Sequence, residues 1–479
     1  MDLFETATSQ IIHHPEYNST LILRSEVVAE HAPPFPPALP VPALDGYAAA
    51  KAVHRKLLPR RPGRDAGLEQ LCTMYALDLD PGAPGGPQHG EQISVLVLSP
   101  LLAPGTSLPY YHPAVSHLAF RYIPSPSPPG SHGLLSIEVV PLASPSPPPD
   151  IALNSRLYRT CLALLDTLHR YGWGALSNYK KRMAHDRIVP REAYQDLYLV
   201  MRERHKWRVD EWCEGTDPLK HVFEDIGIAT YLMLLWKDTF ASATAPTENV
   251  EKVNVETFNP FDHQLTLFTS ISCGNGLLVH ILTAEGYAGH GVDVRARLSW
   301  SHYPPATRAA LHVHALDPTS PARDPYLAPG VFLIGNHADE LSPWVPVLAA
   351  LSGAAGYLSI PCCAWAFDAR FTRSAAKAAL FPVPAHDSRF AEELGLGADG
   401  NNTSAYAAYR IWLAALSAWC GWEVECDALR IPSTRNWAIV GRRKGGEGEG
   451  VENARRIVDE VRNRAVFKTR RPEGKAGDH

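Results

Sequence analysis

A short segment rich in glycine, Cys273-Gly274-Asn275-Gly276, stands between an expected strand and an expected helix. Glycine lets a backbone approach a ligand closely, and the start of a helix offers unpaired N–H groups to that ligand. Asp293 follows 17 residues after Gly276, at the end of the next expected strand. A carboxylate in that position can accept hydrogen bonds from both hydroxyls of a ribose. Together, these residues predict a binding site for a nucleoside cofactor.

The residues after this loop bear on which cofactor it binds. A dinucleotide-binding domain expects G-x-G-x-x-G, but Val279 occupies the third glycine position counted from Gly274. Asp317 ends the third expected strand, and we expect it near an adenine ring. An ordinary tight turn would explain the two glycines alone. Acids at two successive strand ends favour S-adenosylmethionine instead.

Strands and helices alternate from residue 267 to residue 420, and two further strands follow. The expected strands are 267–271, 290–294, 311–315, 331–334, 357–361, 423–426 and 437–441, and the expected helices are 277–285, 343–351 and 403–420. This alternation predicts a parallel sheet with helices on both faces, and the last two strands predict an antiparallel hairpin at one edge. We therefore expect an α/β fold with a Rossmann-like class I methyltransferase sheet over residues 246–445.

The rest of the chain predicts three further regions. Residues 1–150 combine short apolar runs with proline-rich loops and indicate an α+β region whose role the sequence does not reveal. Residues 151–245 predict a helical segment, in which one helix begins at Asp217-Pro218, is apolar nearly all round and should be buried. Residues 446–479 predict a flexible basic tail.

Composition and charge exclude some classes of protein. Eight scattered cysteines without a CxxC pair predict reduced thiols in a cytosolic or nuclear protein, of which we expect the cytoplasm, and no metal site. Because no apolar stretch reaches roughly 18 residues, we expect no membrane span, and the mixed first 30 residues lack the pattern of a secretory signal. A net charge of −5 does not indicate a nucleic-acid binder, but residues 180–208 are locally basic. Such a cluster is either a solvated face or a phosphate-binding surface.

Several long blocks of the sequence resemble one family. The blocks are Tyr194–Tyr198, Asp217–Trp236, Cys273–Gly289, Leu333–Pro346, Pro361–Cys363 and Leu429–Gly441. In this order they resemble the eukaryotic tRNA (uracil-2′-O-)-methyltransferases that modify uridine 44 of serine tRNA. The resemblance covers roughly residues 190–442 and leaves residues 1–150 without a counterpart.

The resemblance implies transfer of a methyl group from S-adenosylmethionine to a ribose 2′-hydroxyl of tRNA, with serine tRNA as the partner. The implied cofactor-binding residues are Ser270, Cys273, Gly274, Asn275, Gly276, Asp293, Asp317 and Asn336. Asp339 and Glu340 follow Asn336-His337 in the strand-end motif, and we expect them to act as the general base or to orient the substrate. Their alternative role is to cap the helix that follows Pro343. His337 is expected more as a core residue than as a base.

Substrate contacts are expected from two basic or polar segments. The loop between the last two strands contributes Arg430, Ser433, Arg435 and Asn436. Lys180 and Lys181 begin the basic segment that would contact the tRNA backbone. An ordinary polar turn is the alternative interpretation of the loop. Cys362 and Cys363 follow the fifth strand, where other ribose methyltransferases have catalytic groups, and we expect these cysteines to serve packing.

The sequence departs from the family pattern V-D-[LI]-G-C-G-N-G in the strand before the loop. Ser270 stands where the family has an acid, and Ser272 stands where it has a glycine. A serine provides no charge attraction to the ammonium of methionine. This departure motivates a second hypothesis, a non-catalytic RNA-binding relative. A third hypothesis is a methyltransferase that acts on another substrate.

Overall fold

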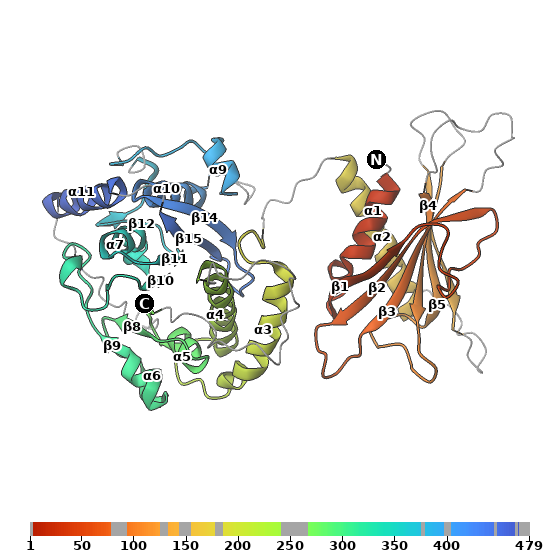
Figure 1. Ribbon diagram of the computed structural model, residues 1–479, viewed down its shortest axis with the longest axis horizontal. Helices are drawn as coiled ribbons and strands as arrows, with labels where there is room; N and C mark the ends of the chain where they lie inside the picture. The colour runs from red at the N-terminus through yellow and green to blue at the C-terminus, as the bar shows by residue number, and fades with distance from the viewer. Residues whose placement is uncertain are drawn as a thin grey trace. The chain divides into compact units, whose positions relative to one another are not determined.

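The computed structural model describes most of the chain as two compact units, residues 1–180 and residues 181–479 (Figure 1). The described residues are 3–77, 93–124, 133–142, 155–177, 185–240, 267–374, 379–396, 404–444, 448–464 and 468. Among them, no helix is both long enough and apolar enough to span a membrane.

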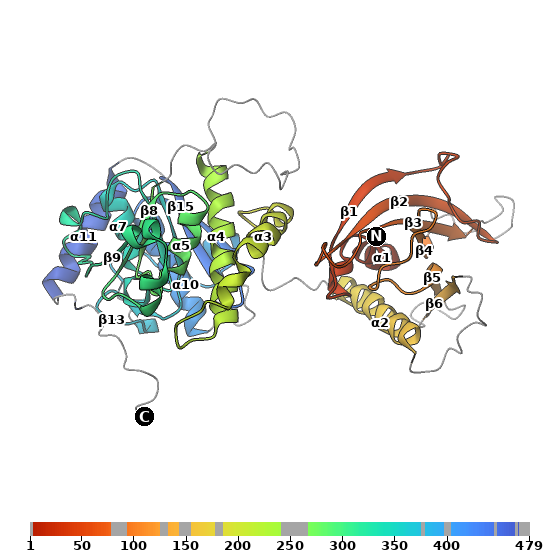
Figure 2. The same ribbon diagram turned by 90° about the horizontal axis from the view of Figure 1, so that it is seen from below.

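The first unit is a six-stranded antiparallel sheet with two helices. Its strands pair in chain order: β1 (Ile22–His31), β2 (Tyr47–Pro59), β3 (Leu68–Leu77), β4 (Ile93–Leu101), β5 (Val115–Ile123) and β6 (Leu134–Pro141). The helices α1 (Leu3–His13) and α2 (Arg156–Leu176) pack against each other, and the sheet curves around them (Figure 2). Buried apolar side chains from both helices and from the sheet form one core, including Phe4, Leu96 and Leu168. The β character expected for this region is confirmed.

The second unit is built on a seven-stranded mixed sheet with the order β14-β15-β11-β10-β7-β8-β9. The bounds are β7 (Phe268–Ile271), β8 (Gly289–Asp293), β9 (Leu311–Val313), β10 (Phe332–Asn336), β11 (Gly356–Ile360), β14 (Trp422–Ala428) and β15 (Trp437–Lys444). Strands β7 to β11 run parallel, while β15 pairs antiparallel with both β11 and β14. The Rossmann-like sheet with an antiparallel C-terminal hairpin is therefore confirmed.

Helices cover both faces of this sheet. One face carries α3 (Arg191–His205), α4 (Pro218–Phe240) and α5 (Leu277–Ala284), and the other carries α7 (Trp344–Ser352), α10 (Ala405–Trp419) and α11 (Glu449–Arg464). Alternate residues of β10 serve the two cores, since Phe332 and Ile334 pack with α4 and α5 while Leu333 packs with α7. The short elements are η1 (Pro15–Tyr17), η2 (Lys206–Val209), η4 (Leu298–His302), α6 (Pro305–Ala310), η5 (Pro321–Arg323), η6 (Asp339–Leu341), β12 (Trp365–Ala366), β13 (Ala369–Arg370) and α9 (Arg389–Glu393).

Two expected regions are divided differently in the structure. The helical segment 151–245 does not stay together: α2 packs in the core of the first unit, and α3 and α4 pack on the sheet of the second. The expected flexible tail 446–479 begins with α11, which buries Ile457, Val458 and Val461. These side chains repeat at helical spacing among many charges, so one face of the helix is apolar although its overall composition is polar.

The strand order reverses direction between β7 and β10. From β7 the chain proceeds outward through β8 and β9, and it then returns to form β10 and β11 on the other side of β7. The connections after β7 and β10 therefore leave the sheet in opposite directions. Open α/β sheets bind ligands at such a point, outside the carboxyl ends of the strands.

Candidate cofactor and substrate site

The glycine loop between β7 and α5 is held by hydrogen bonds to β8 and to η4. The Cys273 N–H donates to the Val292 carbonyl at 3.0 Å, and the Trp300 indole donates to the Gly274 carbonyl at 2.9 Å. Gly276 caps α5 with a φ of 74°. A Cβ on Gly276 would lie 3.0 Å from both methyl carbons of Leu311, so the loop requires a glycine there.

Asp293 connects the end of β8 to this loop. Its Oδ2 accepts the Gly274 N–H at 2.8 Å, and its Oδ1 accepts the Arg295 N–H at 3.4 Å. The side chain is buried and lines the same cavity as the loop. One carboxylate oxygen is thus committed to the loop, while the other makes only a long contact and can accept a ligand hydroxyl.

A cavity of about 610 Å³ lies at the carboxyl ends of β7, β8, β10 and β11. Its size falls in the range of about 300–1,000 Å³ that is common for small-molecule and cofactor sites. The structure brings nine of the expected site residues together in its wall: Ser270, Cys273, Gly274, Asn275, Asp293, Asn336, Asp339, Ser433 and Arg435. The residues proposed for the cofactor and for the substrate therefore share one cavity.

Other expected residues do not line this cavity. Gly276 caps α5 and does not line the cavity. Asp317 is exposed and accepts hydrogen bonds from the backbone N–H and the hydroxyl of Thr319. Arg430 pairs with Asp186, where its Nε lies 2.8 Å from Oδ1. Glu340 is not among the residues that line the cavity. The Asn436 side chain donates a hydrogen bond to the Leu429 carbonyl at 2.7 Å and closes the hairpin loop. Lys180 and Lys181 lie outside the described residues.

The cavity wall also contains charged residues that the sequence did not single out. They are Glu214, Lys220, His221, Glu224, Asp225 and Arg297. Four of them belong to the first turns of α4, within the expected buried helix. The available signal was a pair of adjacent acids, Glu224 and Asp225, on a helix otherwise apolar nearly all round. Buried acids of this kind concentrate at functional sites.

His337 and Glu224 form a pair across the cavity wall. The His337 Nε2 lies 3.0 Å from the Glu224 Oε1, and the Glu224 side chain is only 6% exposed. Burial opposes ionisation of Glu224, but the hydrogen bond and charge of His337 outweigh it and lower the pKa of this carboxyl. His337 adopts a φ of 51°, which is rare for a residue other than glycine. His337 thus belongs to the site rather than to the core.

Asp225 is buried beside Glu224. Burial and the charge of Glu224 raise the pKa of Asp225 to about 8. Because the folded state holds this proton more tightly than the unfolded state, stability is lost as the pH rises from the ordinary aspartate range to about 8.

We predict that Asp225→Asn removes this loss. The free energy of unfolding of the variant minus that of the wild type should increase between pH 5 and pH 8, by at most about 1.4 kcal/mol per pH unit. Urea unfolding at pH 5, 6, 7 and 8 measures the difference. A difference that stays constant across these values would show that Asp225 does not titrate in this window.

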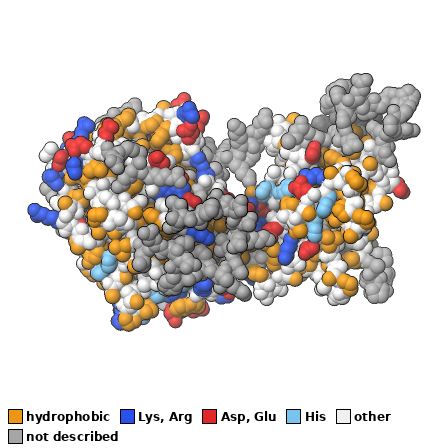
Figure 3. Space-filling model, in the orientation of Figure 1, with side chains coloured by type: hydrophobic (Ala, Val, Ile, Leu, Met, Phe, Trp, Pro, Cys, Tyr) orange, Lys and Arg blue, Asp and Glu red, His pale blue; other side chains and the backbone are white. Residues whose placement is uncertain are grey.

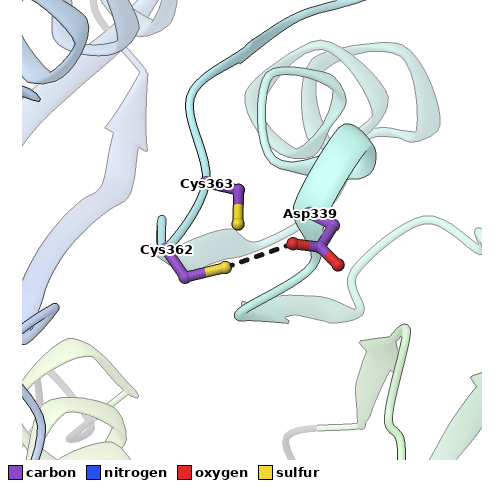
Figure 4. Close-up of side chains that lie close together, drawn as sticks. All are labelled: Asp339, Cys362 and Cys363. Carbon is purple, nitrogen blue, oxygen red and sulfur yellow. Dashed lines mark hydrogen bonds between the residues drawn. The ribbon is translucent and has the colours of Figure 1, made fainter. Parts of the chain in front are cut away.

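Asp339 lies opposite the end of β11. The Cys362 thiol donates to the Asp339 Oδ1 at 3.3 Å, and Cys363 lies beside them (Figure 4). Burial and the nearby Asp339 and Cys363 raise the pKa of the Cys362 thiol.

On the hairpin side, the Arg435 guanidinium lies 4.0 Å from the centroid of the Tyr406 ring. This arrangement offers a cationic, aromatic surface beside the cavity.

The two serines that depart from the family pattern occupy different environments. Ser270 is buried on β7 and lines the cavity. Ser272 has a φ of 56°, in the left-handed region that favours glycine. A glycine at position 272, as in the family pattern, would adopt this backbone without strain.

We predict that Ser272→Gly raises the free energy of unfolding by about 0.5–1 kcal/mol, because the Cβ of an L-residue is strained in this conformation. Chemical denaturation measures the change. Ser272→Ala keeps the Cβ and serves as the control, which should not be stabilised. Equal stabilisation of both variants would place the effect in the hydroxyl rather than in the backbone.

Two family models match different parts of the chain. Residues 1–182 match the family model described as "TRM44-like, N-terminal bet v1-like domain". Residues 188–318, which include the glycine loop and Asp293, match the model described as "Predicted AdoMet-dependent methyltransferase". A solved O-methyltransferase family protein from Burkholderia thailandensis matches at 11% identity over 54% of this chain and 74% of its own, with a TM-score of 0.21.

Curated relatives match over nearly the whole chain. A tRNA (uracil-O(2)-)-methyltransferase from Schizosaccharomyces pombe is 32% identical over 92% of this chain and 82% of its own length. A protein with the same name from Neurospora crassa is 30% identical over 94% of this chain and 86% of its own length. Another from Saccharomyces cerevisiae is 27% identical over 91% of this chain and 84% of its own length. With this identity across both units, the chain belongs to the tRNA (uracil-O(2)-)-methyltransferase family.

Proposed function

We propose that this protein transfers a methyl group from S-adenosylmethionine to the ribose 2′-hydroxyl of a tRNA uridine, and that the uridine is position 44 of serine tRNA. The observation that carries the proposal is the cavity at the carboxyl ends of the strands, in which the glycine loop and Asp293 face the residues of β10 and of the hairpin loop. Membership of the family supplies the substrate class.

The described residues fit S-adenosylmethionine. Space is open where a Cβ on Gly274 would stand, so a ligand can approach the loop closely. Asp293 Oδ1 remains able to accept a ribose hydroxyl. Ser270 has no charge, but Glu214 also lines this cavity and is proposed to supply negative charge for the ammonium of methionine. The loss of the family's acid at position 270 is therefore compatible with binding.

The cofactor, when bound, supplies an electrophilic methyl group. The protein must hold the ribose oxygen in line with that group and accept the hydroxyl proton. We propose that the proton goes to Nδ1 of His337, the ring nitrogen without a hydrogen-bond partner among the described residues, while Glu224 holds Nε2 at 3.0 Å. Asp339 lines the cavity and is proposed to orient the hydroxyl, while Glu340 does not line the cavity and is proposed to support this turn.

We propose that the tRNA is held at the hairpin side of the cavity, where Arg435 lies over Tyr406 and can contact a base or a phosphate. In the described part of the basic segment, two arginines have partners within the second unit. Arg204 pairs with Glu285 at 2.6 Å, and the Arg208 guanidinium lies 4.5 Å from the Trp207 ring centroid. Figure 3 shows Lys and Arg side chains in small groups on the visible face.

The cytoplasm is the proposed compartment. All eight cysteines are free in the structure, including the adjacent Cys362 and Cys363. Free thiols are usual in a reducing compartment.

The ribose at uridine 44 of serine tRNA tests the proposal in cells. In cells that lack this protein, we expect the 2′-O-methyl mark to disappear and to return with the wild-type gene but not with Asp293→Ala. Another ribose methylation on the same tRNA serves as the control. An unchanged mark at uridine 44 would contradict the proposed site of action.

The second hypothesis, a non-catalytic RNA-binding relative, is motivated by Ser270 and Ser272. Calorimetric titration with S-adenosylmethionine separates it from the enzyme. We expect saturable binding with one equivalent of cofactor. Absence of binding, together with retained binding of tRNA, would favour the non-catalytic relative.

A further inference from the structure

Three potential metal ligands meet at one side of the cavity. The thiol sulfurs of Cys362 and Cys363 and a carboxylate oxygen of Asp339 all lie within 4.8 Å of one another. Figure 4 shows both thiols and the carboxylate pointing toward a common space. Two thiols and one carboxylate are a donor set suited to a thiophilic divalent cation.

The fold brings these residues together through neighbouring parallel strands. Asn336 at the end of β10 is in register with Ile360 at the end of β11, and the His337 N–H donates to the Ile360 carbonyl at 3.1 Å. The two cysteines follow β11 after a single proline, and Asp339 begins η6 just after β10. The ligands are therefore positioned by the central strands of the sheet rather than by long loops.

The distances require only a small adjustment to hold zinc. Zinc lies about 2.3 Å from sulfur and about 2.0 Å from carboxylate oxygen, so ligand atoms in a tetrahedral site are about 3.5–3.8 Å apart. The Cys362 Sγ and the Asp339 Oδ1 are already 3.3 Å apart. The widest separation in the cluster is at most 4.8 Å, so it would contract by no more than about 1 Å.

We propose that Cys362, Cys363 and Asp339 bind a zinc-like divalent cation, with the fourth coordination position open to the cavity. Asp339 and Cys362 line the cavity, whereas Cys363 does not, so the cation would stand in the cavity wall. Binding replaces the two thiol protons, which are released to solvent. The fourth position takes a water molecule or, on the proposed function, the ribose hydroxyl, whose pKa the cation would lower.

Cobalt(II) is the probe, because cobalt bound by thiolates shows a charge-transfer band and d–d bands. Purified protein is treated with a chelator under reducing conditions and titrated with Co²⁺ in the absence of cofactor and tRNA. We expect both features to saturate at one equivalent and Zn²⁺ to displace the cobalt. Cys363→Ser should weaken binding at least tenfold and reduce the charge-transfer band.

Cys161→Ser is the matched control, because it removes a thiol from the first unit and should leave the titration unchanged. Asp339→Asn keeps the shape of the side chain and should weaken binding while the band persists. Circular dichroism confirms that each variant is folded. Absence of the band in folded wild-type protein, or an equal band in Cys363→Ser, would overturn the proposal. A mass loss of two hydrogens that marks a Cys362–Cys363 disulfide in the reduced preparation would also overturn it.

The proposal about the cation and the proposal about methyl transfer fail separately. Cobalt binding is read without substrate, so its absence leaves methyl transfer untouched. A protein that binds cobalt but never methylates tRNA would contradict the proposed function alone. Chelated protein that regains methyl transfer with Zn²⁺ would connect the two.

Discussion

Asp293→Ala is expected to weaken the binding of S-adenosylmethionine by at least about 100-fold. The substitution removes a carboxylate that can accept ribose hydroxyls, and hydrogen bonds to charged groups contribute about 1.5–3 kcal/mol each. It also removes the Oδ2 atom that accepts the Gly274 N–H at 2.8 Å, and this hydrogen bond holds the glycine loop in place. Isothermal titration calorimetry measures the dissociation constant.

Asp317→Ala provides the matched control for this prediction. Asp317 also follows a strand of the same sheet, but its side chain is exposed and is bonded to Thr319 rather than facing the cavity. We expect its dissociation constant to stay within about twofold of the wild type. Equal losses in the two variants would show that the cofactor lies elsewhere or that charge alone attracts it.

Glu224→Gln is expected to lower kcat by about 100-fold with little change in KM, because positioned proton acceptors contribute about 10²–10⁴-fold to such reactions. Glu224 acts through His337, so it is a positioning residue, and His337→Gln should cause at least the same loss. Initial rates over a range of tRNA concentrations separate kcat from KM. The dissociation constant of S-adenosylmethionine, measured in parallel, should change by less than about threefold.

Glu340→Gln is the control, since Glu340 belongs to the same strand-end motif but does not line the cavity. Its kcat should remain within about twofold of the wild type. If Glu224→Gln retained full kcat while Asp339→Asn lost it, Asp339 would be the proton acceptor and the assignment to His337 would be wrong.

The sheet and the cofactor loop could be predicted because their signals are local. Apolar runs of strand length alternate with helical spacing, and the loop Cys273–Gly276 lies between them with an acid at the next strand end. Each signal depends on residues close together in the sequence. The pairing of β10 with β7 is long-range, because the chain forms β8 and β9 between them, and the alternation of strands and helices does not specify this pairing.

The remaining features depend on contacts that are distant in the sequence. Helix α2 joins the first unit because its apolar face packs beside α1, which lies about 150 residues earlier. Helix α11 is rich in charged residues, and its buried side chains, among them Ile457, Val458 and Val461, lie on one face. The sequence did not predict a site role for Glu224 and Asp225 of α4. This helix is apolar nearly all round, so its pattern predicts a buried helix but does not show that its first turns line a cavity.

At Ser272, the structure explains a residue preference that the family resemblance only indicated. The family pattern indicated a glycine at this position, but only the backbone angle explains why, since the residue has a φ of 56°. Ser270 is the opposite case. The pattern indicated a lost charge, and the structure shows another acid, Glu214, in the same cavity.

Methylation of the ribose at uridine 44 is tested with purified protein, S-adenosylmethionine carrying a labelled methyl group, and two serine tRNAs. One tRNA has uridine at position 44, and the other has 2′-deoxyuridine there. We predict one labelled methyl group per molecule of the first tRNA, recovered as 2′-O-methyluridine, and none on the second. Equal labelling of both tRNAs, or label recovered on the base, would contradict methylation of the ribose hydroxyl at this position.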